Sequence, residues 1–103
     1  MSPRFVDVTE GTDAHGAVMS ALHQALRDTA ATRAADDSGR GGFDIVTVDV
    51  HVSFFGAATG RLAVQAQVTG GGRSVCFCLA RLVDTQGALV AQAMGTFRAV
   101  ARG

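Results

Sequence analysis

Apolar residues over positions 13–35 recur at three- and four-residue steps, the spacing of one face of an α-helix. The segment contains no proline, and its one glycine, Gly16, lies in the first turn. Thr12 or Asp13 can cap the helix through a side-chain oxygen. At 1.5 Å per residue the helix would be roughly 35 Å long. The positions that form the apolar face are Val18, Ala21, Leu22, Ala25, Leu26 and Thr29.

After a glycine-rich segment at 36–42, which predicts a loop, the period of the pattern changes to two and predicts consecutive β-strands. In the first of them, four valines are expected to share one face and four polar residues the other: Val46, Val48, Val50 and Val52 against Thr47, Asp49, His51 and Ser53.

Three further strands are predicted over 61–68, 74–83 and 88–100, with turns at 56–60, 70–72 and 84–87. The segment 74–83 is apolar on both faces, which predicts a place in the centre of the sheet. Gly95 marks a bulge or a close contact within the last strand. A short strand over 4–8 precedes the helix.

One long helix beside several consecutive strands predicts an α+β fold, with a curved antiparallel sheet wrapped around the helix. The 103 residues are enough for a single domain, 1–103. A core of this size buries only part of the surface, so stability is expected to draw on a partner subunit.

Composition and charge narrow the functional classes. Hydrophobic residues make up 48% of the chain and charged residues 17%, which indicates an ordered domain. The charges of nine basic and nine acidic side chains cancel, so the chain has no net positive charge that would attract nucleic acid or an anionic membrane. No apolar run has membrane-spanning length, and the first residues lack the apolar core of a signal peptide. We therefore expect a soluble, cytoplasmic protein.

The only cysteines, Cys76 and Cys78, alternate with apolar residues inside a predicted strand. Such neighbours point the same way but are too far apart for an easy disulfide, so two buried thiols are expected, in keeping with a reducing cytoplasm. The chain lacks the further ligands that zinc would need, and no metal is expected.

Several motifs, taken in order, resemble the PaaI-like acyl-CoA thioesterases of the phenylacetate pathway, a family with the hotdog fold. They are His15-Gly16-Ala17 at the helix start, residues 46–55 followed by Ala57-Ala58-Thr59-Gly60, Gly72-Arg73-Ser74 opening a strand, the hairpin at 84–89, and the closing segment 91–97. The resemblance covers about residues 13–100, and it implies a sheet of about five strands around the helix.

The resemblance also implies roles for particular residues. The amide of Gly16 would polarise the thioester carbonyl, as suits a helix N-terminus, with His15 and Ala17 beside it. Thr47 matches the family's usual Ser or Thr on the first strand after the helix, and Arg73 with Ser74 lies where a basic residue meets coenzyme A phosphates. Two alternatives stay open: Gly16 only permits close helix–sheet packing, and Arg73 belongs to an ordinary exposed turn.

The chain departs from the family at the catalytic carboxylate, nine residues after the histidine, where it has Gln24. An amide cannot act as a general base or as a carboxylate nucleophile. Asp28 lies one turn further along the same helix face and is a candidate substitute, or else a solvated helix residue. The other candidate is an unusual arrangement around Gln24 that assists attack by water. Asp49 is expected on the same strand face as Thr47, and His23 at a helix border or a subunit contact.

Two functions follow from the resemblance. The first is hydrolysis of a small acyl- or aryl-CoA (or carrier-protein) thioester, with activity reduced by the loss of the carboxylate and with no cofactor beyond the coenzyme A of the substrate. The alternative is a non-catalytic hotdog protein that binds an acyl or aromatic ligand or acts as an oligomeric scaffold. In either case the family implies a homodimer or homotetramer with its sites between subunits. The N-terminal region is shorter than is usual in the family.

Overall fold

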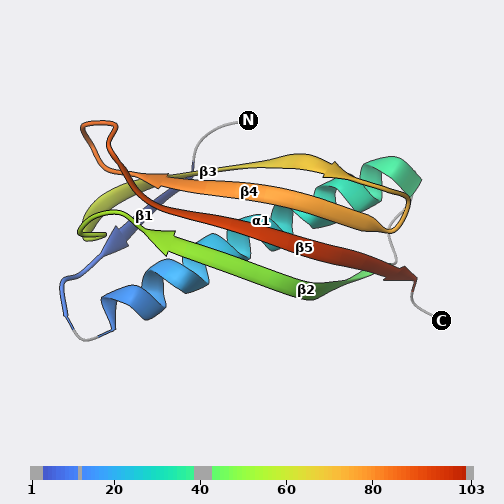
Figure 1. The fold of residues 1–103 in the computed structure, drawn as a ribbon, viewed down its shortest axis with the longest axis horizontal. Coiled ribbons are helices and arrows are strands. Elements are labelled where there is room, and N and C mark those ends of the chain that lie inside the picture. The colour runs from blue at the N-terminus through green and yellow to red at the C-terminus, as the bar shows by residue number, and fades with distance from the viewer. Residues whose placement is uncertain (1–3, 12, 39–42, 102–103) are drawn as a thin grey trace.

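The computed structural model describes residues 4–11, 13–38 and 43–101. Its elements are β1 (Arg4–Val8), α1 (Ala14–Ser38), β2 (Phe43–Phe54), β3 (Gly60–Gly71), β4 (Val75–Val83) and β5 (Leu89–Ala101). The strands form one antiparallel sheet in the order β1-β3-β4-β5-β2, and α1 lies along one face of it (Figure 1). The predicted α+β hotdog arrangement is confirmed, with β4 in the centre of the sheet as expected.

The helix agrees with the apolar pattern but is longer than predicted. It begins directly after Asp13, whose backbone oxygen accepts a hydrogen bond from the amide of Ala17, 3.0 Å away. Thr12, the other candidate cap, lies outside the described residues, as do residues 39–42 of the predicted loop. Residues 36–38 are helical rather than loop, because no glycine or proline interrupts the chain before Gly39.

The core lies between the apolar face of α1 and the concave face of the sheet. Val18, Leu22 and Leu26 are fully buried on the helix side. Leu62, Leu82 and Phe97 are buried opposite them on β3, β4 and β5. Burial of each such side chain contributes about 1.5–3 kcal/mol, so this contact holds the helix on the sheet.

Gly95 is a point of close contact, as one of its two predicted roles required. A Cβ atom at this position would lie 2.7 Å from the ring of Phe97 and 3.2 Å from Cδ1 of Leu26. Glycine therefore lets the helix approach β5. At the predicted hairpin over 84–87, the carboxylate of Asp84 accepts hydrogen bonds from the amides of Gln86 and Ala88, and Gly87 has a positive φ of 85°.

The valine face predicted for β2 is wrong, because a β-bulge interrupts the strand. Thr47 pairs with Phe97 and Asp49 with Thr96, so Val48 is an extra residue without a counterpart on β5. The alternation changes sides there. Val46 and Val48 are 46% and 53% exposed, whereas Val50 and Val52, beyond the bulge, pack against the core.

The bulge also separates two polar residues that were expected on one face. Thr47 points toward α1, where its hydroxyl contacts helix side chains. Asp49 is exposed and borders a groove on the outer face of the sheet beside Phe77 and Met94. The expectation that Asp49 shares the face of Thr47 is therefore wrong.

Candidate functional site

The flank between α1 and the edge strand β2 brings together several of the residues of interest. Since β2 runs back along the helix, its last residue meets the helix start: the rings of Phe54 and His15 stack with centroids 4.4 Å apart. Further along, Thr47 and Ile45 face the middle of the helix. The strip between these two elements, named the α1–β2 groove, lies at the edge of the sheet, because β2 is an edge strand.

A polar cluster occupies the middle of the α1–β2 groove. Nε2 of His23 lies 2.9 Å from Oγ1 of Thr47. Nη1 of Arg27 donates to the backbone oxygen of Ile45 at 3.1 Å and, more distantly, to Thr47 Oγ1 at 3.5 Å. The cluster depends on the bulge, because without it the Thr47 hydroxyl and the inward valines could not both face the helix.

Gly16, Ser20, His23 and Arg27 form one stripe on the helix, at steps of four, three and four residues. The sequence interpretation included Gly16 but left His23 at a helix border and did not consider Arg27. The signal was present in the spacing, since residues seven apart on a helix share a face. What was missing was the position of Thr47, which depends on how β2 pairs with β5.

Gly16 lies in the first turn of α1, where amide groups lack partners within the helix. The nearest atom to a Cβ at this position would be Oδ1 of Asp13, 2.5 Å away, and the next two are also atoms of that carboxylate group. Close helix–sheet packing therefore does not explain this glycine. The space that a side chain at Gly16 would take is occupied by the carboxylate of Asp13, which lies at the end of an exposed side chain.

Gln24 and Asp28 lie together, but away from Thr47. Nε2 of Gln24 donates to Oδ1 of Asp28 at 2.9 Å, and Oδ2 of Asp28 lies 2.9 Å from Nη2 of Arg4 on β1. Asp28 thus faces one edge of the sheet and Thr47 the other. Within one chain, the four candidate catalytic residues divide between the two flanks of the helix.

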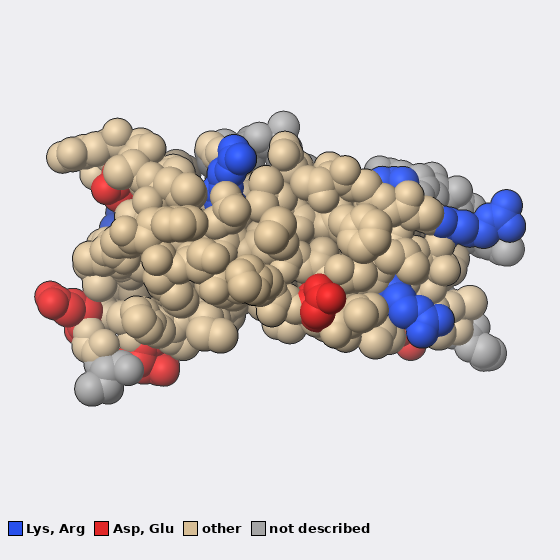
Figure 2. All heavy atoms as spheres, viewed as in Figure 1, with Lys and Arg blue, Asp and Glu red and all other residues tan. Residues whose placement is uncertain are grey.

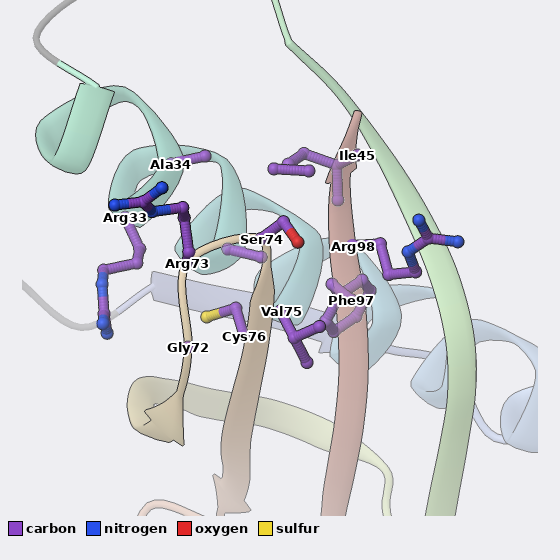
Figure 3. A pocket seen from close by; sticks show the side chains of 12 residues that line it. Arg33, Ala34, Ile45, Gly72, Arg73, Ser74, Val75, Cys76, Phe97 and Arg98 are labelled. Atoms are coloured by element: carbon purple, nitrogen blue, oxygen red, sulfur yellow. The ribbon is translucent and has the colours of Figure 1, made fainter. Parts of the chain in front are cut away.

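Arg73 and Ser74 line a cleft at the far end of the helix from His15, Gly16 and Ala17 (Figure 3). Gly16 and Ala34, which also lines the cleft, are separated by roughly 27 Å of helix. The cleft is small, with about 20 Å³ of space that a water-sized group can occupy and about 270 Å³ when the space open to solvent is counted. Arg33 and Arg73 lie on one side of it and Arg98 on the other, around an apolar floor that includes Ile45, Cys76 and Phe97.

Ile45 connects this cleft to the α1–β2 groove. Its backbone oxygen accepts the hydrogen bond from Arg27, and the residue also lines the cleft. The helix start, the polar cluster and the arginine-rimmed cleft therefore follow one another along the same side of α1.

The two cysteines are free and buried, as predicted, with their sulfur atoms 3.5 Å apart. Burial raises the pKa of Cys78 from 9.0 to about 12, helped by the neighbouring Cys76 and opposed by Arg33. The Cys78 thiol is therefore protonated at neutral pH and is a poor nucleophile. Among the described residues, no three His, Cys, Asp or Glu side chains are grouped so as to hold a metal ion. No helix in the described part of the chain is long and apolar enough to cross a membrane.

The curled antiparallel sheet around one helix, with a glycine at the helix start, defines the class as a hotdog protein, and solved structures support this. AziG from S. sahachiroi has a TM-score of 0.78 and 22% identity, covering 94% of this chain and 81% of that one. The BH2602 protein from Bacillus halodurans, solved with CoA, has a TM-score of 0.71 and 18% identity, covering 90% and 60%. The E. coli PaaI protein, from the phenylacetic acid degradation operon, has a TM-score of 0.71 and 18% identity, covering 84% and 59%.

The sequence match defines the family. The model of the thioesterase superfamily matches residues 11–91, which is most of the chain, and the protein belongs to that superfamily. The comparison with curated proteins finds no match. The chain spans about three-fifths of the BH2602 and PaaI chains. At these identities the likeness to solved structures shows a shared fold.

Proposed function

We propose that this protein hydrolyses a small acyl- or aryl-CoA thioester in the manner of PaaI-like enzymes, with the substrate lying along the α1–β2 groove. The observation that carries the proposal is that Gly16, at the start of α1, and Thr47, beside the middle of α1, lie on the same flank of the helix. Membership of the thioesterase superfamily and the fold shared with a CoA-bound protein support it. A hydrolase of this kind acts on a cytoplasmic substrate and needs no cofactor of its own.

The chemistry requires a group that polarises the carbonyl and a group that positions water. A first-turn amide at Gly16 belongs to the positive end of the helix dipole, where an oxyanion is stabilised as it develops. The lack of a side chain at Gly16 would let a thioester approach the backbone once the Asp13 carboxylate, which lies over this position, turns away. The hydroxyl of Thr47 orients the attacking water.

The arginine-rimmed cleft at the other end of the groove suits the phosphates of coenzyme A. Arg73 and Arg33 approach from one side and Ser74 lies between them and β5 (Figure 3). Arginine is well suited to phosphate because its guanidinium group presents several donors in a plane. The apolar floor would accept part of the pantetheine arm.

Self-association would complete the site. β2 is a twelve-residue edge strand with no proline, so its free edge can pair with β2 of a second copy and close the groove. The outer face of the sheet, on which Figure 2 shows few charged side chains and one acidic group near the middle, exposes Phe77 and Met94 and offers a second contact for a tetramer. Sedimentation at micromolar concentration should show a dimer or tetramer, and a monomer would count against this arrangement.

The test of function is free-thiol release from a panel of acyl- and aryl-CoA thioesters. Turnover by the wild-type protein that depends on Gly16 supports the proposal. Binding without turnover, with hydrolysis appearing only in Gln24→Asp, would instead identify a non-catalytic ligand-binding protein that has lost its base. Neither binding nor turnover across the panel would overturn the proposal.

A further inference from the structure

Thioester hydrolysis needs a base, and the position that carries one in the family is occupied by Gln24. Asp28 is not placed to act on the groove, because its two oxygens are engaged by Gln24 and Arg4 on the β1 side. Beside Thr47 stands one titratable group that can accept a proton near neutral pH, the imidazole of His23, 2.9 Å away.

Building on the proposed function, we propose that His23 is the base of the reaction and that it withdraws the proton of the attacking water through the hydroxyl of Thr47. A hydroxyl and an imidazole within hydrogen-bond reach, with the imidazole held by a third group, are the arrangement by which proteins activate weak nucleophiles. Here the ring of Phe97, stacked on that of His23 with centroids 6.2 Å apart, limits the orientation of the imidazole.

The hydrogen bonds favour this direction of proton transfer. Nη1 of Arg27 is a donor only and points at Thr47 Oγ1, so it fills a lone pair of that oxygen. If the attacking water fills the other lone pair, the hydroxyl hydrogen is left for Nε2 of His23, which accepts it in the tautomer that carries its proton on Nδ1. Arg27 is itself held by the backbone oxygen of Ile45.

The distance between Gly16 and His23 along the helix also fits this mechanism. Gly16 and His23 are seven residues apart on one face, roughly 10 Å along the axis. Helical side chains lean toward the N-terminus, which brings the imidazole back toward Gly16. A carbonyl bonded to the Gly16 amide and a water about 3 Å from its carbon, bonded to Thr47, would occupy that span.

The step balances without another reactant. The water oxygen attacks the carbonyl carbon as one water proton passes to Thr47 Oγ1 and the Thr47 proton passes to His23 Nε2. The carbonyl electron pair moves onto the oxygen that faces the Gly16 amide. When the C–S bond breaks, the C=O bond re-forms, and the imidazolium returns its proton through Thr47 to the leaving thiolate. The products are a carboxylic acid and a thiol.

The groups around His23 define its expected pH behaviour. On its own helix the charged neighbour is Arg27, on β2 the neighbours are Thr47 and the backbone of Ile45, and on β5 the neighbour is Phe97. The mechanism needs an uncharged imidazole. Turnover should therefore fall in acid, because a protonated imidazole can no longer accept the proton.

The test compares His23→Gln with His51→Gln, whose histidine is exposed on the outer groove of the sheet. We expect His23→Gln to lower kcat on the order of 100-fold with little change in KM, and to remove the acid limb of the pH profile. His51→Gln should keep both the rate and the profile. Circular dichroism and thermal unfolding establish that each variant is folded.

A second set of variants keeps the proposal falsifiable if His23→Gln folds poorly. Thr47→Val should lose about as much activity as His23→Gln, and Thr47→Ser should keep most of it. Because the two residues act as one unit, the double variant should be no slower than either single one. A wild-type enzyme that is active while His23→Gln or Thr47→Val retains its rate and acid limb would overturn the role of His23 alone. A wild-type protein inactive on every thioester would overturn the proposed function as well.

Discussion

Gln24 donates a hydrogen bond to Asp28, and the second oxygen of that carboxylate pairs with Arg4 on β1. The position that the family resemblance assigns to the catalytic carboxylate is thus part of a surface network that ties the helix to the first strand. Asp28 and Arg4 are half exposed, so their ion pair is expected to contribute no more than about 1 kcal/mol.

This network leads to a prediction about Gln24→Asp. A second carboxylate one helical turn before Asp28 removes a donor and adds a like charge, which should lower the free energy of unfolding by about 0.5–1 kcal/mol at pH 7. Urea unfolding at pH 7 measures the loss, with Gln24→Ala as the uncharged control. Equal stability of the two variants at pH 7 would contradict the like-charge effect.

Gly16→Ala tests the helix start. The new methyl would displace the Asp13 carboxylate, the end of an exposed side chain, so the cost to stability should stay within about 1 kcal/mol. The methyl would also stand where the thioester must approach the amide, so kcat/KM should fall at least about tenfold, the equivalent of 1.4 kcal/mol. Gly11→Ala, with open space around its Cβ, is the matched control for both measurements. Full activity in Gly16→Ala would remove this amide from the mechanism.

The fold could be predicted from sequence because its signals are local. The four-residue spacing of Val18, Leu22 and Leu26 defines the buried helix face, and the period of two defines the strands. The bulge at Val48 could not be predicted, because it is a mismatch in the pairing of β2 with β5. In the sequence of β2, apolar and polar residues alternate without interruption across it. The candidate site could not be predicted for the same reason. The contact of His23 with Thr47 joins residues 24 apart in the sequence, and it depends on how β2 pairs with β5.

Gly95→Ala tests the close contact between helix and sheet. Its Cβ would overlap the ring of the fully buried Phe97 and press on Leu26, and neither side chain has room to move. Such overpacking should lower the free energy of unfolding by about 1–3 kcal/mol. Gly70→Ala, a strand position whose Cβ would make an ordinary 3.6 Å contact with Phe77, should change it by much less. Denaturant unfolding distinguishes them, and a stable Gly95→Ala would mean that the helix can move away from β5.

The raised pKa of Cys78 predicts a loss of stability at alkaline pH. Burial holds this thiol protonated to about pH 12 in the folded chain, whereas its ordinary pKa is 9.0. Above pH 9 the unfolded chain therefore loses the proton first, and the free energy of unfolding should fall as pH rises, by at most about 1.4 kcal/mol per pH unit for one group. The chain has no tyrosine, and its nine basic side chains are all arginine, so few other groups titrate in this range. Urea unfolding between pH 8 and 11 should show the slope in the wild type and a shallower one in Cys78→Ala; equal slopes would mean that the thiol is not buried as described.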